Sequence, residues 1–194
     1  MKNFKEVEQH IIRILKTDLP DDLYYHGMHH TIDVLNASEF IGNKERISKN
    51  DMLLLKVAAL YHDAGFTKTY QNHEEAGCKM AIADLPEFGF SQEEINIICG
   101  MIKATKIPQK PKTKLECILA DADLEYLGTS DFKRIGDTLF DEMKKYMGVK
   151  TTREWNTIQL HFLETHKYHT AFCKKHRETE KQKHIIELKK SLKR

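Results

Sequence analysis

Several features are scarce or missing in this chain of 194 residues, and each absence excludes a class of protein. No segment alternates between apolar and polar residues for long enough to predict a β-strand, and there is no internal repeat, long heptad run or low-complexity linker. No apolar segment has the length or flanks of a secretory leader or a membrane span. We therefore expect a protein built from helices alone, with no membrane partner.

The cysteines are few and lack a recognisable pattern. Cys78, Cys99, Cys117 and Cys173 form no C-x-x-C motif, and they stand inside apolar helical segments. Lone cysteines in such segments are usually small core residues. We expect a reduced, cytoplasmic protein without disulfides.

The charge is nearly balanced overall but unevenly distributed. The formal net charge is +2, and residues 174–194 hold nine Lys or Arg against three Glu. A lysine-rich final helix usually has a solvated face, here with Ile185, Leu188 and Leu192 packed inward. Nucleic-acid binding by this tail is the alternative, but no aromatic residue follows Phe172 to stack on a base. Nucleic acid is therefore not an expected partner.

Apolar residues at helical spacing and helix-start motifs predict about nine helices in a single domain, 1–194. The core would span residues 22–130, and residues 131–194 would form a helical extension packed on it. Four pairs have a Ser or Thr followed three residues later by an acid, which is typical of a helix start: Ser48 with Asp51, Ser91 with Glu94, Thr113 with Glu116, and Thr151 with Glu154.

One segment should cross the core. Residues 52–61 are apolar apart from Lys56, which predicts a helix buried on most of its circumference, and His62 and Asp63 follow at its end. Burying an ionisable pair in such surroundings costs on the order of several kcal/mol, unless the pair has a counter-charge or binds a metal. We therefore expect His62 and Asp63 to contact a charged partner or a metal ion.

A second apolar helix is also interrupted by carboxylates, at Asp121 and Asp123. A single acid in such a helix could be a structural residue bonded to a nearby helix start. Taken together, however, His30, His62, Asp63 and Asp121 provide two imidazoles and two carboxylates, a set that suits a divalent ion with open positions. We expect one ion per chain, from among Mn, Fe, Co, Ni, Zn and Mg.

The order His30, His62-Asp63, Asp121 resembles the HD superfamily of metal-dependent phosphohydrolases over residues 22–130. Residues 121–128 also match the segment Asp-Ala-Asp-Leu-x-Tyr-Leu-Gly of uncharacterised bacterial members. The resemblance implies an all-α HD-type domain whose ion is held by these four residues. We expect Asp63 or Asp121 to steer the attacking water while it binds the ion, and Asp123 to orient a metal ligand from behind it.

Residues 25–34 resemble the segment Tyr-His-Asn-x-x-His-Ala-x-Asp-Val of cyclic-nucleotide phosphodiesterases, with Gly27 for Asn and Thr31 for Ala. This likeness implies that His26 donates a proton to the leaving oxygen. Dinuclear members have two further histidines before the last Asp, whereas this chain offers only His73. We expect His73, Lys106 and His166 to bind the substrate.

The sequence thus predicts a metal-dependent hydrolase of a phosphoester or phosphoanhydride in a nucleotide or similarly small phosphorylated metabolite. A non-catalytic sensor that binds a nucleotide in the same pocket is the alternative. Release of phosphate or of a nucleoside would distinguish the enzyme from the sensor.

Overall fold

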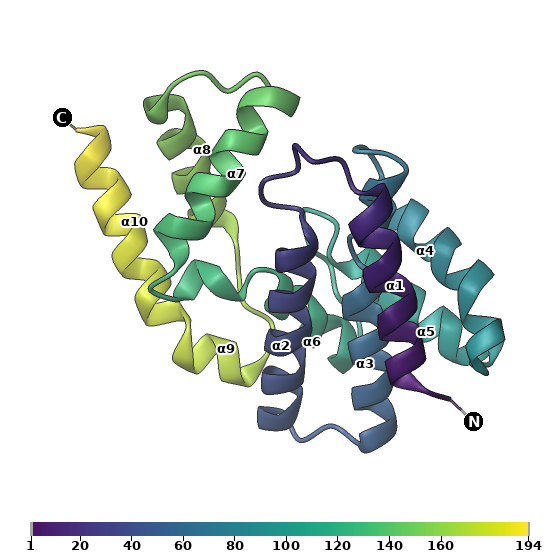
Figure 1. The fold of residues 1–194 in the computed structure, drawn as a ribbon. Helices are drawn as coiled ribbons and strands as arrows, with labels where there is room; N and C mark the ends of the chain where they lie inside the picture. Colours follow the sequence, from purple (N-terminus) through teal and green to yellow (C-terminus); the bar gives the residue numbers. More distant parts are fainter. Residues whose placement is uncertain (1, 194) are drawn as a thin grey trace.

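The protein is all-α, as the sequence predicts. A computed structural model describes residues 2–193, in which there are ten α-helices, three short 3-10 helices and no strand (Figure 1). None of the helices in this range is long and apolar enough to span a bilayer. The α-helices are α1 (Phe4–Asp18), α2 (Met28–Lys44), α3 (Lys49–Tyr61), α4 (His73–Asp84), α5 (Gln92–Ala104), α6 (Lys114–Asp123), α7 (Phe132–Tyr146), α8 (Thr152–Thr165), α9 (Ala171–His176) and α10 (Glu178–Leu192); the 3-10 helices are η1 (Ala64–Thr67), η2 (Leu85–Phe88) and η3 (Glu125–Gly128).

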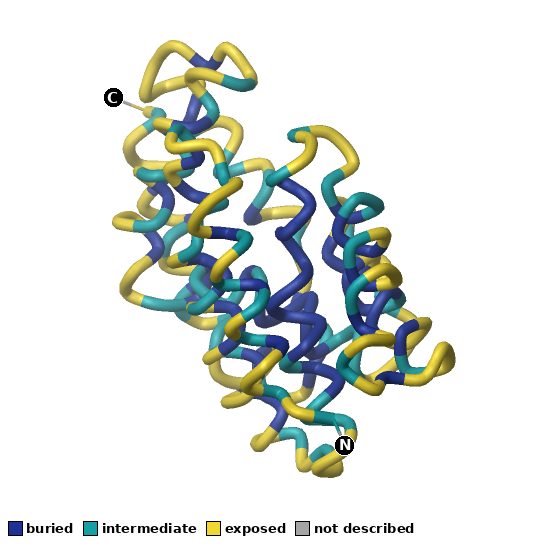
Figure 2. The backbone as a smooth tube through the Cα atoms, turned by 45° about the vertical axis from the view of Figure 1, so that its right-hand side comes forward, coloured by how far each residue is buried: buried dark blue, intermediate teal, exposed yellow. Residues whose placement is uncertain are grey.

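Helix α3 lies at the centre of the main hydrophobic core. Leu54, Leu55 and every residue of 57–61 are buried, and α3 packs against α2 and α5 (Figure 2). The predicted buried helix is therefore confirmed. Because α3 is surrounded, the residues that follow it, His62 and Asp63, end inside the protein.

A second, smaller core joins the C-terminal helices to η3. It contains Leu124, Leu127, Phe132, Leu163, Ile185 and Leu188. Helix α10 packs along α8 and η3, while α9 reaches α2 (Figure 1). Ile185 and Leu188 are buried as predicted, whereas Leu192 is only half-buried.

The predicted helix starts are present. Ser91 with Glu94, Thr113 with Glu116 and Thr151 with Glu154 form complete capping boxes, and the Ser48 hydroxyl accepts from the amide of Asp51. Such caps satisfy amide groups that the helix itself leaves unpaired. Asn72, the residue before α4, differs from these caps, because it adopts a left-handed backbone conformation and its side chain makes no cap hydrogen bond.

A close approach between Gly65 and α4 determines where α4 begins relative to Asp63. A Cβ on Gly65 would lie 1.9 Å from the carbonyl oxygen of His73 and 2.7 Å from the amide nitrogen of Gly77. Both are backbone atoms, so no side-chain rotation could relieve the clash. The absence of a side chain at Gly65 therefore lets His73 and Glu74 lie next to Asp63.

We expect Gly65→Ala to lower the free energy of unfolding by about 1–3 kcal/mol, the usual range for overpacking, and to displace α4. Gly100→Ala is the matched control, because its Cβ would meet only the Glu116 side chain, at 3.1 Å. Thermal melts of both variants test this. Equal melting temperatures for Gly65→Ala and the wild type would contradict it.

Candidate metal centre and active site

Three ligand-type side chains from different helices converge on one point. His30 lies in the first turn of α2, His62 directly follows α3, and Asp123 ends α6. The Nε2 atom of His30 is 3.1 Å from Oδ1 of Asp123 and 3.5 Å from Nε2 of His62. These three groups could hold a divalent metal ion.

Asp63 completes the cluster from the same side. Its Oδ2 lies 3.2 Å from Nε2 of His62 and 3.5 Å from Nε2 of His30. This oxygen is buried and accepts no hydrogen bond within residues 2–193. A buried carboxylate oxygen without a donor is destabilising unless it meets a cation, so this observation fits a bound ion.

The orientation of His62 and the charge of Asp123 also suit metal binding. His62 uses Nδ1 to contact the carbonyl oxygen of Ala59 at 2.7 Å, which leaves Nε2 directed at the cluster. Burial alone would raise the pKa of Asp123, but hydrogen bonds from His30 and His62 lower this pKa to about 2. Asp123 is therefore an anion at neutral pH.

Asp121 does not reach this cluster, which corrects the sequence-based prediction. Its Oδ1 accepts from the amide of His169 at 2.8 Å, and its Oδ2 accepts from the amide and hydroxyl of Thr170 at 2.8 and 2.6 Å. Thr170 is the N-cap of α9, so Asp121 is the carboxylate bonded to a nearby helix start. Asp123, predicted to stand behind a ligand, lies in the cluster itself, with Oδ1 3.1 Å from Nε2 of His30.

His26 faces the same site and is held by a residue that sequence reasoning missed. Glu142, fully buried on α7, accepts from the amides of Tyr25 and His26 at 3.0 and 3.1 Å. Its Oε1 is 2.5 Å from Nδ1 of His26. Burial alone would lower the pKa of His26, but the hydrogen bond to Glu142 and nearby carboxylates raise it.

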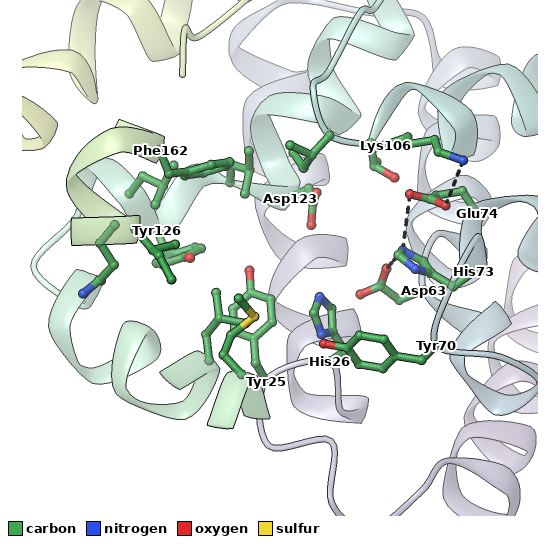
Figure 3. Close-up of a pocket in the computed structure, with 18 of the residues that line it drawn as sticks. Tyr25, His26, Asp63, Tyr70, His73, Glu74, Lys106, Asp123, Tyr126 and Phe162 are labelled. Carbon is green, nitrogen blue, oxygen red and sulfur yellow. Dashed lines mark ion pairs between the residues drawn. The ribbon is translucent and has the colours of Figure 1, made fainter. Parts of the chain in front are cut away.

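Phe66 orients two histidines at once. The Phe66 ring stacks on His26 with 4.4 Å between centroids and on His73 with 3.9 Å. The Nε2 atom of His73 lies 3.5 Å from Oδ1 of Asp63 and 3.7 Å from Oε1 of Glu74 (Figure 3). Packing therefore brings His73 beside the group of His30, His62, Asp63 and Asp123, which we call the metal-type cluster.

Lys106 reaches the same cavity but is already paired. Its Nζ lies 2.8 Å from Oε1 of Glu75, 3.0 Å from Oδ1 of Asn72 and 3.9 Å from Oε2 of Glu74. Glu74 is buried and its Oε2 accepts no hydrogen bond within residues 2–193. A substrate anion would have to share this lysine with Glu75.

These groups line one end of a cavity of about 570 Å³ (Figure 3). Its wall includes His26, Asp63, His73, Lys106 and Asp123. The structure does not bring His166 here: it lines a second cavity of about 340 Å³, which shares Leu124 and Phe162 with the first. Burial lowers the pKa of His166 to about 4, so this residue is neutral at pH 7.

Comparisons with known proteins agree with this geometry. The HD domain family matches residues 27–125, slightly more than half of the chain, and the chain belongs to that family. A solved structure described as a predicted HD superfamily hydrolase, from an uncultured Thermotogales bacterium, has a TM-score of 0.65 and 21% identity, covering 97% of this chain and 91% of that chain. At this identity the likeness concerns the fold. No curated protein matches the chain.

The contrast between Asp121 and Asp123 gives a paired test. We expect Asp123→Asn to fold normally and to lose the bound ion, because it removes a ligand charge. Asp121→Asn should keep the ion but melt at lower temperature, because its amide would face a donor of Thr170, a loss of about 1–3 kcal/mol.

Elemental analysis and thermal melts of the two variants, purified alongside the wild type, provide both readouts. Loss of the ion in Asp121→Asn with retention in Asp123→Asn would restore the assignment predicted from the sequence.

Proposed function

We propose that this protein is a metal-dependent phosphohydrolase that cleaves a phosphoester or phosphoanhydride of a small phosphorylated metabolite. The observation that carries the proposal is the convergence of His30, His62, Asp63 and Asp123 at one end of a cavity, where Oδ2 of Asp63 lies close to both imidazoles but accepts no hydrogen bond within residues 2–193. Membership of the HD family supports the same reading.

The four residues would hold one divalent ion, and mixed imidazole and carboxylate ligands suit Mn, Fe, Co, Ni or Zn. Such an ion, when bound, lowers the pKa of water toward neutrality and offsets phosphate charge. On the side of Asp63 away from His30 and His62, His73 is the one histidine whose ring lies within 3.5 Å of the Asp63 carboxylate among the described residues. Because a second ion would need two further histidines, this single imidazole favours one ion per chain.

His26 is the proposed proton donor to the leaving oxygen. Its Nδ1 is engaged by Glu142, so Nε2 is the ring nitrogen available to substrate in the cavity. Glu142 raises the pKa of His26 and favours the protonated ring at the start of the reaction. Glu142 is therefore a positioning residue that acts through His26.

The remaining groups of the polar end would position the phosphate. His73 and Lys106 supply positive charge or hydrogen-bond donors on the side of the cavity opposite Tyr126 and Phe162 (Figure 3). The carboxylate of Asp63 faces both His62 and His73, at 3.2 and 3.5 Å, so it could also accept a proton from an attacking water.

A screen of phosphorylated nucleotides and sugars with added Mn²⁺, Co²⁺, Ni²⁺ or Zn²⁺, followed by phosphate and nucleoside detection, tests the activity. We expect His62→Ala to lose both the ion and turnover. His26→Ala should keep the ion and lose at least about a hundredfold in kcat, the usual contribution of general acid catalysis. Saturable nucleotide binding without any product would favour the sensor instead.

The pH profile tests the role of Glu142. His26 must be protonated to act as an acid, so kcat falls as the pH rises through its pKa, which Glu142 raises. We expect Glu142→Gln to move this falling limb to lower pH. Asp137→Asn, an exposed acid on the same helix, is the control. An unchanged limb in Glu142→Gln would remove Glu142 from the mechanism.

A further inference from the structure

The loop between η1 and α4 brings a tyrosine to the contact between Glu142 and His26. The hydroxyl of Tyr70 donates to Oε1 of Glu142 at 3.3 Å, the same oxygen that contacts Nδ1 of His26. The Tyr70 ring is perpendicular to the His26 ring, with 6.5 Å between centroids, and it lines the cavity (Figure 3). Three segments far apart in the chain therefore meet here: the loop with Tyr70, the residues before α2, and helix α7.

Tyr70 completes the hydrogen bonding of a fully buried carboxylate. Oε2 of Glu142 accepts from the amides of Tyr25 and His26, while Oε1 contacts the His26 ring and accepts from Tyr70. Burial and the charge of Glu142 raise the pKa of Tyr70, so its hydroxyl keeps its proton and donates. Removing one donor from a buried carboxylate leaves part of its charge unsatisfied. Within residues 2–193, His26 would then be the one hydrogen-bond partner left to Oε1.

The ring of Tyr70 is itself held in place by α7. It stacks on Tyr146 with 4.1 Å between centroids and 2° between ring planes, and the edge of Phe66 packs against it at 5.4 Å. Tyr146 is fixed in turn, because its hydroxyl donates to Oδ1 of Asp22 at 2.7 Å. Aromatic contacts on two sides restrict the ring of Tyr70 and so direct its hydroxyl at Glu142.

We infer that Tyr70 is a positioning residue for the proton donor: it holds the Glu142 carboxylate, and through it the His26 imidazole, in the orientation that directs Nε2 of His26 into the cavity. This inference rests on the proposed function, in which His26 protonates the leaving oxygen. The Tyr70 hydroxyl is engaged by Glu142, so it acts through His26 and does not transfer the proton itself. Direct contact between this hydroxyl and the substrate is the alternative, and it would change KM.

Two leaving groups separate the positioning of a proton donor from a general effect on the fold. Phenyl and p-nitrophenyl phosphates are similar in shape, but phenolate is the more basic leaving group and gains more from protonation in the transition state. Both are assayed as monoesters and as diesters, with the divalent ion that best supports hydrolysis. We expect His26→Ala to lose much more activity with the phenyl esters than with the p-nitrophenyl esters.

Tyr70→Phe keeps the ring and removes the hydroxyl. It should lower kcat for the phenyl esters about threefold to tenfold, the value of one hydrogen bond, and leave kcat for the p-nitrophenyl esters and KM for both unchanged. In the double variant with His26→Ala, Tyr70→Phe should cause no further loss, because Tyr70 acts through His26. Tyr24→Phe is the matched control, since Tyr24 is 50% exposed, and it should change neither parameter.

Tyr146→Leu removes the stack but keeps the Tyr70 hydroxyl, and it should show the same selective loss with the phenyl esters. Thermal melts and elemental analysis of each variant report whether the fold and the ion are retained. Equal losses with the two leaving groups, no loss with either, a higher KM with unchanged kcat in Tyr70→Phe, or a further loss in the double variant would overturn the inference.

The two proposals fail in different ways. A wild-type protein that hydrolyses none of these esters and no compound of the wider screen refutes the phosphohydrolase, and the role of Tyr70 with it. Hydrolysis by the wild type, with Tyr70→Phe affecting both leaving groups equally, refutes the role of Tyr70 and leaves the phosphohydrolase standing.

Discussion

The buried charge of Asp63 is the constraint on which the rest of the site depends. Helix α3 is enclosed by the core, so the Asp63 that follows it is only 5% exposed. Its two oxygens face His30 and His62 on one side and His73 on the other, all within 3.5 Å. The three imidazoles offset the buried charge of Asp63 only while α2, α3 and α4 hold their positions, and Gly65 permits the approach of α4. The packing of these helices and the stability of the charged site therefore depend on each other.

The C-terminal helices complete the site, although they lie outside the HD match at residues 27–125. The backbone preceding α9 binds both oxygens of Asp121 and so anchors α6, which ends in Asp123. Helix α7 supplies Glu142 to His26, and side chains of α7 and α8 line the cavity. Within this chain, the segment before residue 130 provides the metal-type cluster, and the segment after it provides the carboxylate that contacts His26 and part of the cavity wall.

The comparison of Asp121 with Asp123 shows why neighbouring acids are hard to assign from sequence. Both interrupt the same apolar helix, and both are anchored by groups distant in the chain. Which one faces His30 depends on the rotation of α6 about its axis, and that rotation depends on the contact between Asp121 and Thr170, 49 residues later. Glu142 was missed for a related reason: it stands in a charged stretch, and only its place three residues after Leu139, at the edge of an apolar stripe, marks it.

The sequence by itself determined the helical class, the buried helix at 52–61, the capped helix starts and the family, because these follow from local periodicity and short motifs. It also brought His26, His30, His62, Asp63, His73 and Lys106 into consideration, all of which line or approach one site. Only the tertiary structure decided between Asp121 and Asp123, joined Glu142 to His26, and placed His166 in a second cavity. Those outcomes depend on contacts between segments far apart in the chain, which local patterns do not encode.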